Sequence, residues 1–372
     1  MYSEWLMFIW FLFSLCFSIV IAGLPLFKSV DGLDKRNKNS LDGLRCVLAL
    51  MVVFHHFFLN YYLHTEGEWI IKNANFFSNI GPFAVGLFFI LSGYLFSNID
   101  LKGLSWWLVF YKKRIFRIVP ISIVSSVICI IVAYHYGTSS DASVMNIIPW
   151  FDGGIANIRP TIFGMDGSSL INSGVSWTLV WEWRLYFSLP IVAILVPLSI
   201  RLPVSFSISS ISLALFLLSK SYPFPFDSIA LKSIFFFSAG FFCRHIKSER
   251  ISILSNNKLF QAFIVVITAI LLFFSITIAK LLVLVLSVVI FLMVCNGCSF
   301  FGLLVSKGAI RIGIISYSVY LLHGIFWYVG FLSFINEKYL ILSSSVVFIA
   351  MMVFSFLVSK YIEYPIYERS KG

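Results

Sequence analysis

Positions 41–56 read LDGLRCVLALMVVFHH, and they open an apolar run that continues to about residue 63. A run of roughly 20 mostly apolar residues is long enough to cross the hydrocarbon core of a membrane as one helix. This run also carries Arg45 near its start and His56 in its interior. An ionisable residue within a spanning helix is costly, so by default it marks a functional site that faces the interior of a bundle. The stretch therefore predicts a membrane helix and a candidate site together.

The rest of the chain repeats this apolar pattern. Of its 372 residues, 60% are hydrophobic and 12% are charged, whereas soluble domains have roughly 45–50% and about 25%. This composition excludes an ordinary soluble domain. We predict an all-α, polytopic integral membrane helix bundle of about 11 transmembrane helices, at about 5–27, 44–63, 80–97, 116–135, 178–197, 203–220, 228–244, 259–277, 280–298, 310–331 and 339–361.

Basic residues give these predicted helices an orientation. The first run follows no Lys or Arg and is followed by Lys28, Lys35 and Arg36, so its N-terminus is expected outside, in the periplasm. With alternating loops, 20 of the 27 Lys and Arg residues fall inside, six fall outside and Arg184 falls within a helix. The resulting net charges are +13 inside and −2 outside. The overall charge of +11 is thus interpreted as a topology signal, with no nucleic-acid partner and a cytoplasmic C-terminus.

The cysteines and the longest loop carry weaker signals. All six cysteines fall in or beside apolar runs, which does not support a disulfide framework. Cys295 and Cys298 have the spacing of a zinc or redox pair, but no second ligand pair accompanies them, and no metal is predicted. The loop at about 136–177 is expected outside, and two interpretations of it stay open: recognition of an acceptor, or a solvated connector.

Helical geometry predicts that His56 shares a face with Arg45. Eleven steps of about 100° leave the two side chains within roughly 20° of each other, whereas His55 lies about 80° away. They are about 16 Å apart along the axis, so Arg45 is expected at the cytoplasmic mouth and His56 past the middle of the membrane. An imidazole can act as a general base because its usual pKa of about 6.5 lies near neutral pH. The alternative is a structural histidine bonded to another helix.

Glu182 is the candidate carboxylate. It lies about four residues below the expected outer end of its helix, and His56 lies about seven below the outer end of its own, so their depths of about 6 and 10 Å are compatible. Glu182 is therefore predicted to orient the His56 imidazole. Arg184 points to the opposite face of the helix and is a poor partner for Glu182. The alternative is a glutamate that reaches water within a belt of tryptophans.

Two further clusters are candidate site residues. Ser316, Tyr320 and His323 recur at i, i+4 and i+7, which makes one polar stripe that can line the same cavity or can hold helices together. Arg114 and Arg117 share a helix face and can bind phosphate groups bidentately. The preference of basic residues for the cytoplasmic side explains these arginines without any ligand.

Taken in order, these segments resemble the acyltransferase 3 family of bacterial integral-membrane acyltransferases, especially lipopolysaccharide O-antigen O-acetyltransferases. The resemblance is carried by 41–45 with His56, FFILSGYL at 88–95, RIFRIVP at 114–120, the Glu-containing helix at 177–186 and the Ser-Tyr helix at 316–323. It implies a ten-helix acyltransferase domain at 41–365, preceded at 1–40 by an extra N-terminal helix with its cytoplasmic loop and followed by a cytoplasmic tail at 366–372.

The resemblance also implies an activity and a location. An acetyl group would pass from cytoplasmic acetyl-CoA to a sugar hydroxyl of a lipid-linked or surface glycan, within the bacterial inner membrane and its lipids. His56 and Glu182 would be catalytic, and Arg45, Arg114 and Arg117 would hold the donor. Peptidoglycan, exopolysaccharide or a glycolipid as acceptor, succinyl as acyl group and an acyl-histidine intermediate stay open. The competing classes are a transporter or flippase whose path these polar residues line, and a scaffold subunit. The sequence gives no indication of oligomeric state.

Overall fold

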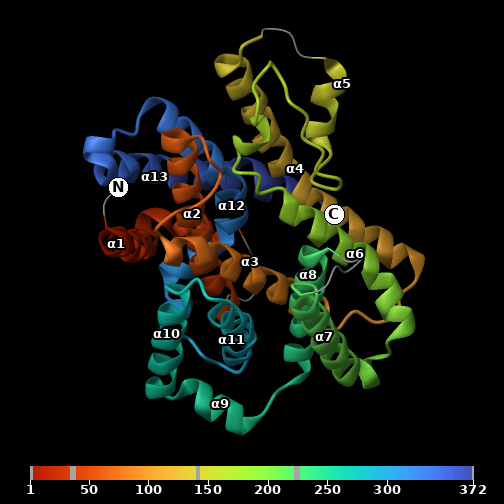
Figure 1. Cartoon of the computed structure of the whole chain (residues 1–372). Coiled ribbons are helices and arrows are strands. Elements are labelled where there is room, and N and C mark those ends of the chain that lie inside the picture. Colours follow the sequence, from red (N-terminus) through yellow and green to blue (C-terminus); the bar gives the residue numbers. More distant parts are fainter. Residues whose placement is uncertain (1–2, 34–38, 140–142, 222–226, 371–372) are drawn as a thin grey trace.

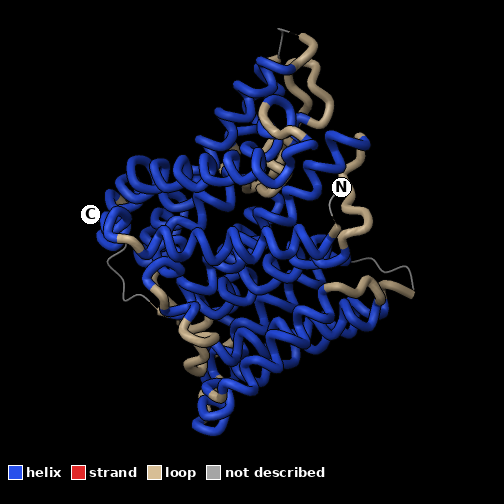
Figure 2. Tube along the Cα trace, turned by 90° about the vertical axis from the view of Figure 1, so that its left-hand side faces the viewer, coloured by secondary structure: helices blue, strands red, loops and turns tan. Residues whose placement is uncertain are grey.

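The computed structural model describes residues 3–33, 39–139, 143–221 and 227–370. These residues form helices, turns and loops, with no strand among them, which confirms the predicted polytopic helix bundle (Figures 1 and 2). Four basic residues that the charge pattern assigns to the cytoplasmic side lie outside the described residues: Lys35, Arg36, Lys38 and Lys371.

Each predicted apolar run coincides with a helix. These helices are α1 (Glu4–Gly23), α2 (Ser40–Glu66), α3 (Asn75–Phe96), α4 (Leu104–Tyr136), α6 (Trp177–Leu195), α7 (Arg201–Leu218), α8 (Ser228–His245), α10 (Lys258–Leu272), α11 (Thr277–Cys295), α12 (Lys307–Ser333) and α13 (Leu340–Val358). Shorter helices are α5 (Val144–Ile147), α9 (Glu249–Asn256) and α14 (Tyr364–Arg369). Tight 3-10 segments lie at Pro25–Gly32, Ile148–Phe151, Ser168–Leu170, Leu198–Ile200, Leu303–Val305 and Glu337–Tyr339, and a π-helical turn lies at Ser359–Glu363.

The expected number of about 11 spanning helices is too high. In the described part of the chain, nine helices are long and apolar enough to cross a membrane, or ten if α8 and α9, which are bent by 109°, form one span. The helix α10 has 15 residues, or about 22 Å, which is shorter than the roughly 30 Å hydrocarbon core. The apolar run at 259–277 is long enough in sequence to span a membrane, but the helix within it ends at Leu272, and the remaining apolar residues lie beyond the helix.

The centre of the bundle is the pair α2 and α12. In the apolar spans of α2 and α12, 72% and 78% of the residues are buried inside the bundle, compared with 28% in the span that contains α7. The two backbones approach closely, since a Cβ added at Gly313 would lie 1.8 Å from the Asp42 carbonyl oxygen. Small residues allow such close helix contacts within membranes. The two helices that carry Arg45, His56 and His323 are thus fixed directly against each other.

The FFILSGYL segment forms part of α3 and contacts α8. A Cβ added at Gly93 would lie 2.1 Å from the backbone oxygen of Phe237, so only glycine fits there. Close helix packing therefore accounts for this glycine without any ligand.

The N-terminal helix α1 is attached to α12 through Arg311. The Arg311 guanidinium donates to the backbone oxygens of Ala22 and Leu24, both at 2.8 Å, and pairs with Asp31 at 2.8 Å. These bonds satisfy carbonyl groups at the end of α1 that lack helical partners.

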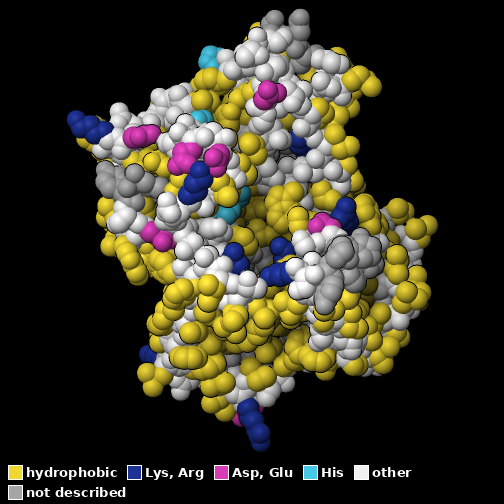
Figure 3. Space-filling view, in the orientation of Figure 1, with side chains coloured by type: hydrophobic (Ala, Val, Ile, Leu, Met, Phe, Trp, Pro, Cys, Tyr) yellow, Lys and Arg dark blue, Asp and Glu magenta, His cyan; other side chains and the backbone are white. Residues whose placement is uncertain are grey.

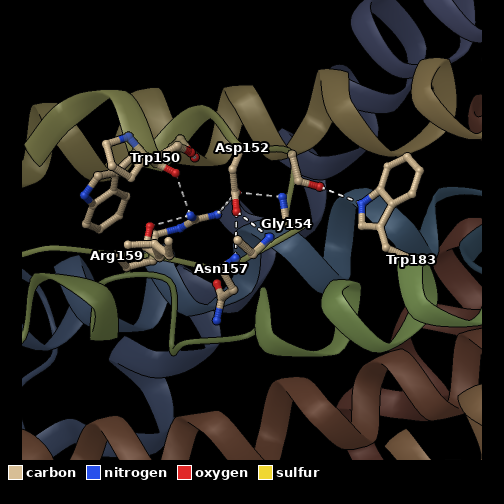
Figure 4. Close-up of polar contacts among 11 residues, drawn as sticks. Trp150, Asp152, Gly154, Asn157, Arg159 and Trp183 are labelled. Atoms are coloured by element: carbon tan, nitrogen blue, oxygen red, sulfur yellow. Dashed lines mark hydrogen bonds and ion pairs between the residues drawn. The ribbon is translucent and has the colours of Figure 1, made fainter. Parts of the chain in front are cut away.

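Part of the segment 143–176 packs against α4 and α6, and Figure 4 shows the turn around Asp152 with its contact to Trp183. The Trp150 side chain is fully buried, and its backbone oxygen accepts a hydrogen bond from Ser126 of α4 at 2.5 Å. Trp183 of α6 donates to the Gly153 oxygen at 3.0 Å. A Cβ added at Gly153 would lie 2.9 Å from Val119, which is 17 residues, or about 25 Å, before the end of α4. The buried part of this segment therefore packs against α4 and α6, whereas residues such as Met145 and Ile158 are exposed.

An ion pair between Asp152 and Arg159 holds together the turn at 152–159 in this segment. Asp152 pairs with Arg159 at 2.9 Å and also accepts the backbone N–H groups of Gly154, Ala156 and Asn157 (Figure 4). Burial raises the pKa of Asp152, but the Gly154 hydrogen bond and the charge of Arg159 outweigh that effect and leave the pKa below its ordinary value. The ionised carboxylate thus organises an irregular turn in which Gly153 and Gly154 are buried and Ile155 is exposed.

Candidate functional site

Two cavities lie in series along α3. The first, which we call the arginine cavity, has a volume of about 320 Å³, and its lining includes Arg45, Arg114, Arg117, Glu182, Tyr186, Ser316, Tyr317, Tyr320 and Tyr367. The second, which we call the histidine cavity, has a volume of about 750 Å³, and its lining includes His55, His56, Trp177, Lys220, Lys232, Lys280 and Tyr320. Both volumes are in the range of small-molecule sites, about 300–1,000 Å³.

The two cavities extend toward opposite ends of the bundle and adjoin in the middle. The N-terminal half of α3 lines the histidine cavity from Ser78 onward, and its C-terminal half lines the arginine cavity as far as Phe96. Three residues line both cavities: Val85 and Phe89 of α3, and Tyr320 of α12. A molecule in one cavity would therefore come close to a molecule in the other at Tyr320.

The structure brings most of the predicted site residues to these cavities. Six of the eight line the arginine cavity: Arg45, Arg114, Arg117, Glu182, Ser316 and Tyr320. His56 lines the histidine cavity, and His323 is fully buried in contact with His56. The face that Arg45 and His56 share along α2 thus spans both cavities.

In the arginine cavity, one guanidinium group, that of Arg114, has a buried donor without a partner among the described residues. The Arg114 guanidinium lies over the rings of Phe96, Phe110 and Tyr186, at 5.3, 5.5 and 5.8 Å from their centroids. Its Nε is buried and has no hydrogen-bond partner. A buried donor without a partner is costly, so an acceptor group bound there would be stabilised. Arg45 differs, because it pairs with Asp42 at 2.6 Å.

His56 and His323 form a hydrogen-bonded pair that fixes their tautomers. The His323 Nδ1 atom lies 3.1 Å from the Val319 oxygen, and a carbonyl oxygen only accepts, so this nitrogen carries the hydrogen. In the neutral ring the His323 Nε2 atom then accepts, and it lies 3.0 Å from His56 Nδ1. His56 Nδ1 also lies 3.1 Å from the Val52 oxygen, so it carries a hydrogen as well. The lone pair of the neutral His56 ring is therefore on Nε2.

Neighbouring side chains hold the His56 backbone in place. Asn60 donates from Nδ2 to the His56 oxygen at 2.8 Å and to Ser173 Oγ at 3.0 Å. Trp327 donates to the Val53 oxygen at 2.9 Å, and the Trp69 ring lies 6.3 Å from the His56 ring. The imidazole thus belongs to a rigid, largely buried frame, as a catalytic or binding group requires.

Glu182 does not contact His56. Its Oε1 atom accepts a hydrogen bond from the Tyr186 hydroxyl, and its side chain lines the arginine cavity. The reason is the depth at which α6 begins. The residues before it dip between the helices: a Cβ added at Gly324, next to His323, would lie 2.3 Å from Asn172. The Thr178 hydroxyl, in the first turn of α6, lies 3.0 Å from the Tyr320 hydroxyl. Glu182 follows one helical turn later and therefore lies in the arginine cavity, past Tyr320 and away from His56. The assumption that this helix begins at the outer surface is wrong.

Sequence reasoning also missed several residues at these cavities. Three residues with hydroxyl groups also line the arginine cavity: Thr178, Tyr186 and Tyr317. Thr178 and Tyr186 lie four residues before and after Glu182, and Tyr317 follows Ser316, so their positions along these helices could have indicated them. Three lysines of the histidine cavity were counted only as outer-loop charges: Lys220, Lys232 and Lys280. In the ranges that the structure describes, no group of three or more His, Cys, Asp or Glu residues could hold a metal ion.

Comparison with known proteins gives one match. A family model described as an acyltransferase domain, that of the acyltransferase 3 family, matches residues 38–364, which is most of the chain. No curated protein and no solved structure matches.

Proposed function

The chain belongs to the acyltransferase 3 family, and from this premise we propose that it transfers an acetyl group from acetyl-CoA to a sugar hydroxyl at the junction of its two cavities. The observation that carries the proposal is the position of His56 in the histidine cavity, which adjoins the arginine cavity at Tyr320. The His323 contact leaves the lone pair of His56 on Nε2, where it can accept a proton.

The arginine cavity is the proposed donor site. Acetyl-CoA carries several phosphate groups, and the guanidinium groups of Arg114 and Arg117 suit them in charge and in geometry. Arg45 lines the same cavity, with its charge already paired with that of Asp42. The acyl end of the donor would extend past Ser316 toward Tyr320. Glu182 is proposed to act in this cavity, through its bond with Tyr186.

The transfer step uses one imidazole. The His56 Nε2 atom takes the hydroxyl proton as the hydroxyl oxygen bonds to the thioester carbonyl carbon. The carbon–sulfur bond then breaks, and the proton passes from His56 to the departing thiolate. The products are an acetyl ester and CoA with a free thiol, and His56 returns to its neutral state. No covalent acyl-enzyme is required in this direct route.

The acceptor is proposed to be a cell-surface polysaccharide of the bacterial inner membrane pathway, with lipopolysaccharide O-antigen favoured. This choice rests on the resemblance of the ordered motifs to O-antigen O-acetyltransferases. The charge pattern supports an arrangement in which the arginine cavity opens to the cytoplasm, where acetyl-CoA is made, and the histidine cavity opens to the periplasm.

The decisive test compares two histidines of α2. His56→Ala and His64→Ala are expressed in a host whose surface polysaccharide lacks acetylation, and ester-linked acetate is measured at matched protein levels. We expect His56→Ala to lose about 10²–10⁴-fold in rate, the usual effect of removing a general base. His64→Ala should keep wild-type transfer, since His64 packs against Phe331, with ring centroids 5.6 Å apart, outside the lining of either cavity. Normal acetylation by a correctly inserted His56→Ala protein would disprove the assignment and favour a transporter or scaffold.

A further inference from the structure

Three lysines from separate segments line the histidine cavity. Lys220 follows α7, Lys232 lies in the second turn of α8 and Lys280 lies in the first turn of α11. The Nζ atoms of Lys220 and Lys232 lie 5.0 and 5.5 Å from the centroid of the same ring, that of Phe216. The fold therefore holds two like charges beside one aromatic ring, an arrangement that their mutual repulsion opposes.

The positive charge of this cavity is not neutralised by its own lining. Among the described residues, no Asp or Glu lines the cavity, and no ion pair involves any of the three lysines. Asp227 precedes the lining residue Ser228 and offsets part of the charge of Lys232. Its carboxylate, however, caps α8 by accepting the Ile229 N–H at 3.0 Å. The lining thus has a net positive charge that a bound anion would balance.

The same cavity has an apolar wall. Hydrophobic lining residues come from the helices that carry the lysines and from the end of α10: Phe216, Leu217, Leu271, Phe274, Leu281 and Leu284. Figure 3 shows a face of the molecule with a hollow that is lined by hydrophobic side chains and has basic side chains at its edge. A ligand that fits would carry a negative group and a hydrocarbon chain together.

We propose that the histidine cavity binds an acceptor glycan joined to a lipid through a phosphate or diphosphate, which Lys220, Lys232 and Lys280 hold. The lysines fix the phosphate, the apolar wall contacts the lipid, and the sugar next to the phosphate extends toward His56 in the same cavity. The identity of the ligand as an acceptor rests on the proposed function. Its phosphate requirement is a separate property of the cavity and can be measured by binding alone.

The binding experiment uses the full chain in detergent with two probes, farnesyl diphosphate and farnesol. Wild type should bind the diphosphate more tightly than the alcohol. The triple variant Lys220→Gln, Lys232→Gln, Lys280→Gln should lose at least about tenfold in affinity for the diphosphate, because it removes three positive charges that can each donate a charge-assisted hydrogen bond. Affinity for farnesol should not change. The control Lys338→Gln, outside the lining of either cavity, should bind both probes as wild type does.

Two comparisons keep this result interpretable. The triple Lys→Arg variant keeps the charge, so it should fold and retain binding even where the glutamine variant is unstable. Vesicles of phosphatidylglycerol should displace the diphosphate poorly. Equal binding of the two probes by wild type, an equal loss in Lys338→Gln, loss of diphosphate binding in the arginine variant, or ready displacement by phosphatidylglycerol would each overturn the phosphate site.

An acetyl-transfer assay separates this proposal from the proposed function. A lipid-diphosphate-linked sugar and the same sugar on a neutral lipid are offered to wild type and to the triple glutamine variant. The variant should show a raised KM for the charged acceptor only, with kcat nearly kept. If wild type binds the diphosphate but transfers acetyl to neither acceptor, the transferase function fails while the phosphate site remains. Equal use of both acceptors with unchanged KM in the variant would overturn the lysine site alone.

Discussion

At the scale of single residues, the His56–His323 pair is the most informative contact. In many hydrolases a carboxylate holds the catalytic histidine in one tautomer, and here another imidazole takes that position, at 3.0 Å. The sequence predicted that His323 belongs to a polar stripe that can line the same cavity as His56 or can hold helices together, and the structure places it against the His56 ring. The sequence could not indicate that His323 is the direct partner, because that depends on how α2 and α12 face each other.

His323 is therefore predicted to be a positioning residue. Replacing it by Ala removes one of the two acceptors near His56 Nδ1–H and leaves the Val52 oxygen. Because the ring then loses its side-chain partner, we expect kcat to fall by about 10–10²-fold with little change in KM for either substrate. His323→Gln can accept the same hydrogen through its side-chain oxygen and should recover part of the rate. Steady-state kinetics of purified protein in vesicles tests this. Equal kcat for the Ala and Gln variants would argue against a positioning role.

Arg114 gives a prediction about the donor. Arg114→Ala should raise KM for acetyl-CoA by about tenfold, since a lost bond to a charged group costs about 1.5–3 kcal/mol. Acetyl-pantetheine has no phosphate groups, so its KM should not change. Arg184→Ala is the matched control, because its guanidinium lies 4.3 Å from the Trp181 ring, outside the lining of either cavity. A similar rise in KM for both donors would refute the phosphate contact.

At the scale of elements, the helices followed from the sequence, but the long N-terminal part of α4, which begins at Leu104, and the depth at which α6 begins did not. Hydropathy located every long apolar helix, because burial in lipid requires apolar residues over a fixed length. It placed the start of α6 within one residue, at 178 against Trp177, but not its depth in the bundle, since the segment before α6 contacts other helices through bonds such as that of Trp183 to Gly153. The depth assigned to Glu182 was wrong for this reason, whereas the depth of His56, on a continuous helix, was not affected.

The Asp152–Arg159 pair predicts how stable this segment is. Asp152→Asn should lower the free energy of unfolding by about 1–3 kcal/mol, since three backbone N–H groups and Arg159 lose a charged acceptor. Because the pKa of Asp152 is below its ordinary value when folded, this stabilisation is present above about pH 4. It is lost as the pH falls through the folded-state value. Thermal unfolding in detergent against pH measures both effects, and exposed Asp166→Asn should show neither.

Gly93 tests the contact between α3 and α8. Gly93→Ala forces a Cβ to within 2.1 Å of the Phe237 oxygen, which is backbone and cannot turn away. We expect a loss of about 1–3 kcal/mol or failure to fold. Gly103→Ala should be tolerated, because nothing lies within 4 Å of the added atom. Thermal unfolding of the two variants compares them directly, and equal melting temperatures would contradict the close packing.

At the scale of the whole molecule, the distribution of charge predicts the orientation in the membrane. On a background with the native cysteines replaced, a cysteine introduced at Lys102 should react with an impermeant reagent only after the cytoplasmic side is opened. One introduced at exposed Asp166 should react in intact spheroplasts. The opposite pattern would invert the assignment of donor and acceptor cavities, while the geometry that joins them would stand.

The junction at Tyr320 has a consequence for the cell's energy supply. Cavities that extend toward both ends of the bundle adjoin at Val85, Phe89 and Tyr320, and Thr178 contacts the Tyr320 hydroxyl at 3.0 Å. In the proposed function the donor and the acceptor meet there, and the membrane must keep its proton gradient while they do so. The Tyr320 ring is therefore expected to block the passage of protons between the two cavities, and Tyr320→Gly, which removes the ring, should make the membrane leak protons. An enzyme that works across a membrane must carry its own seal.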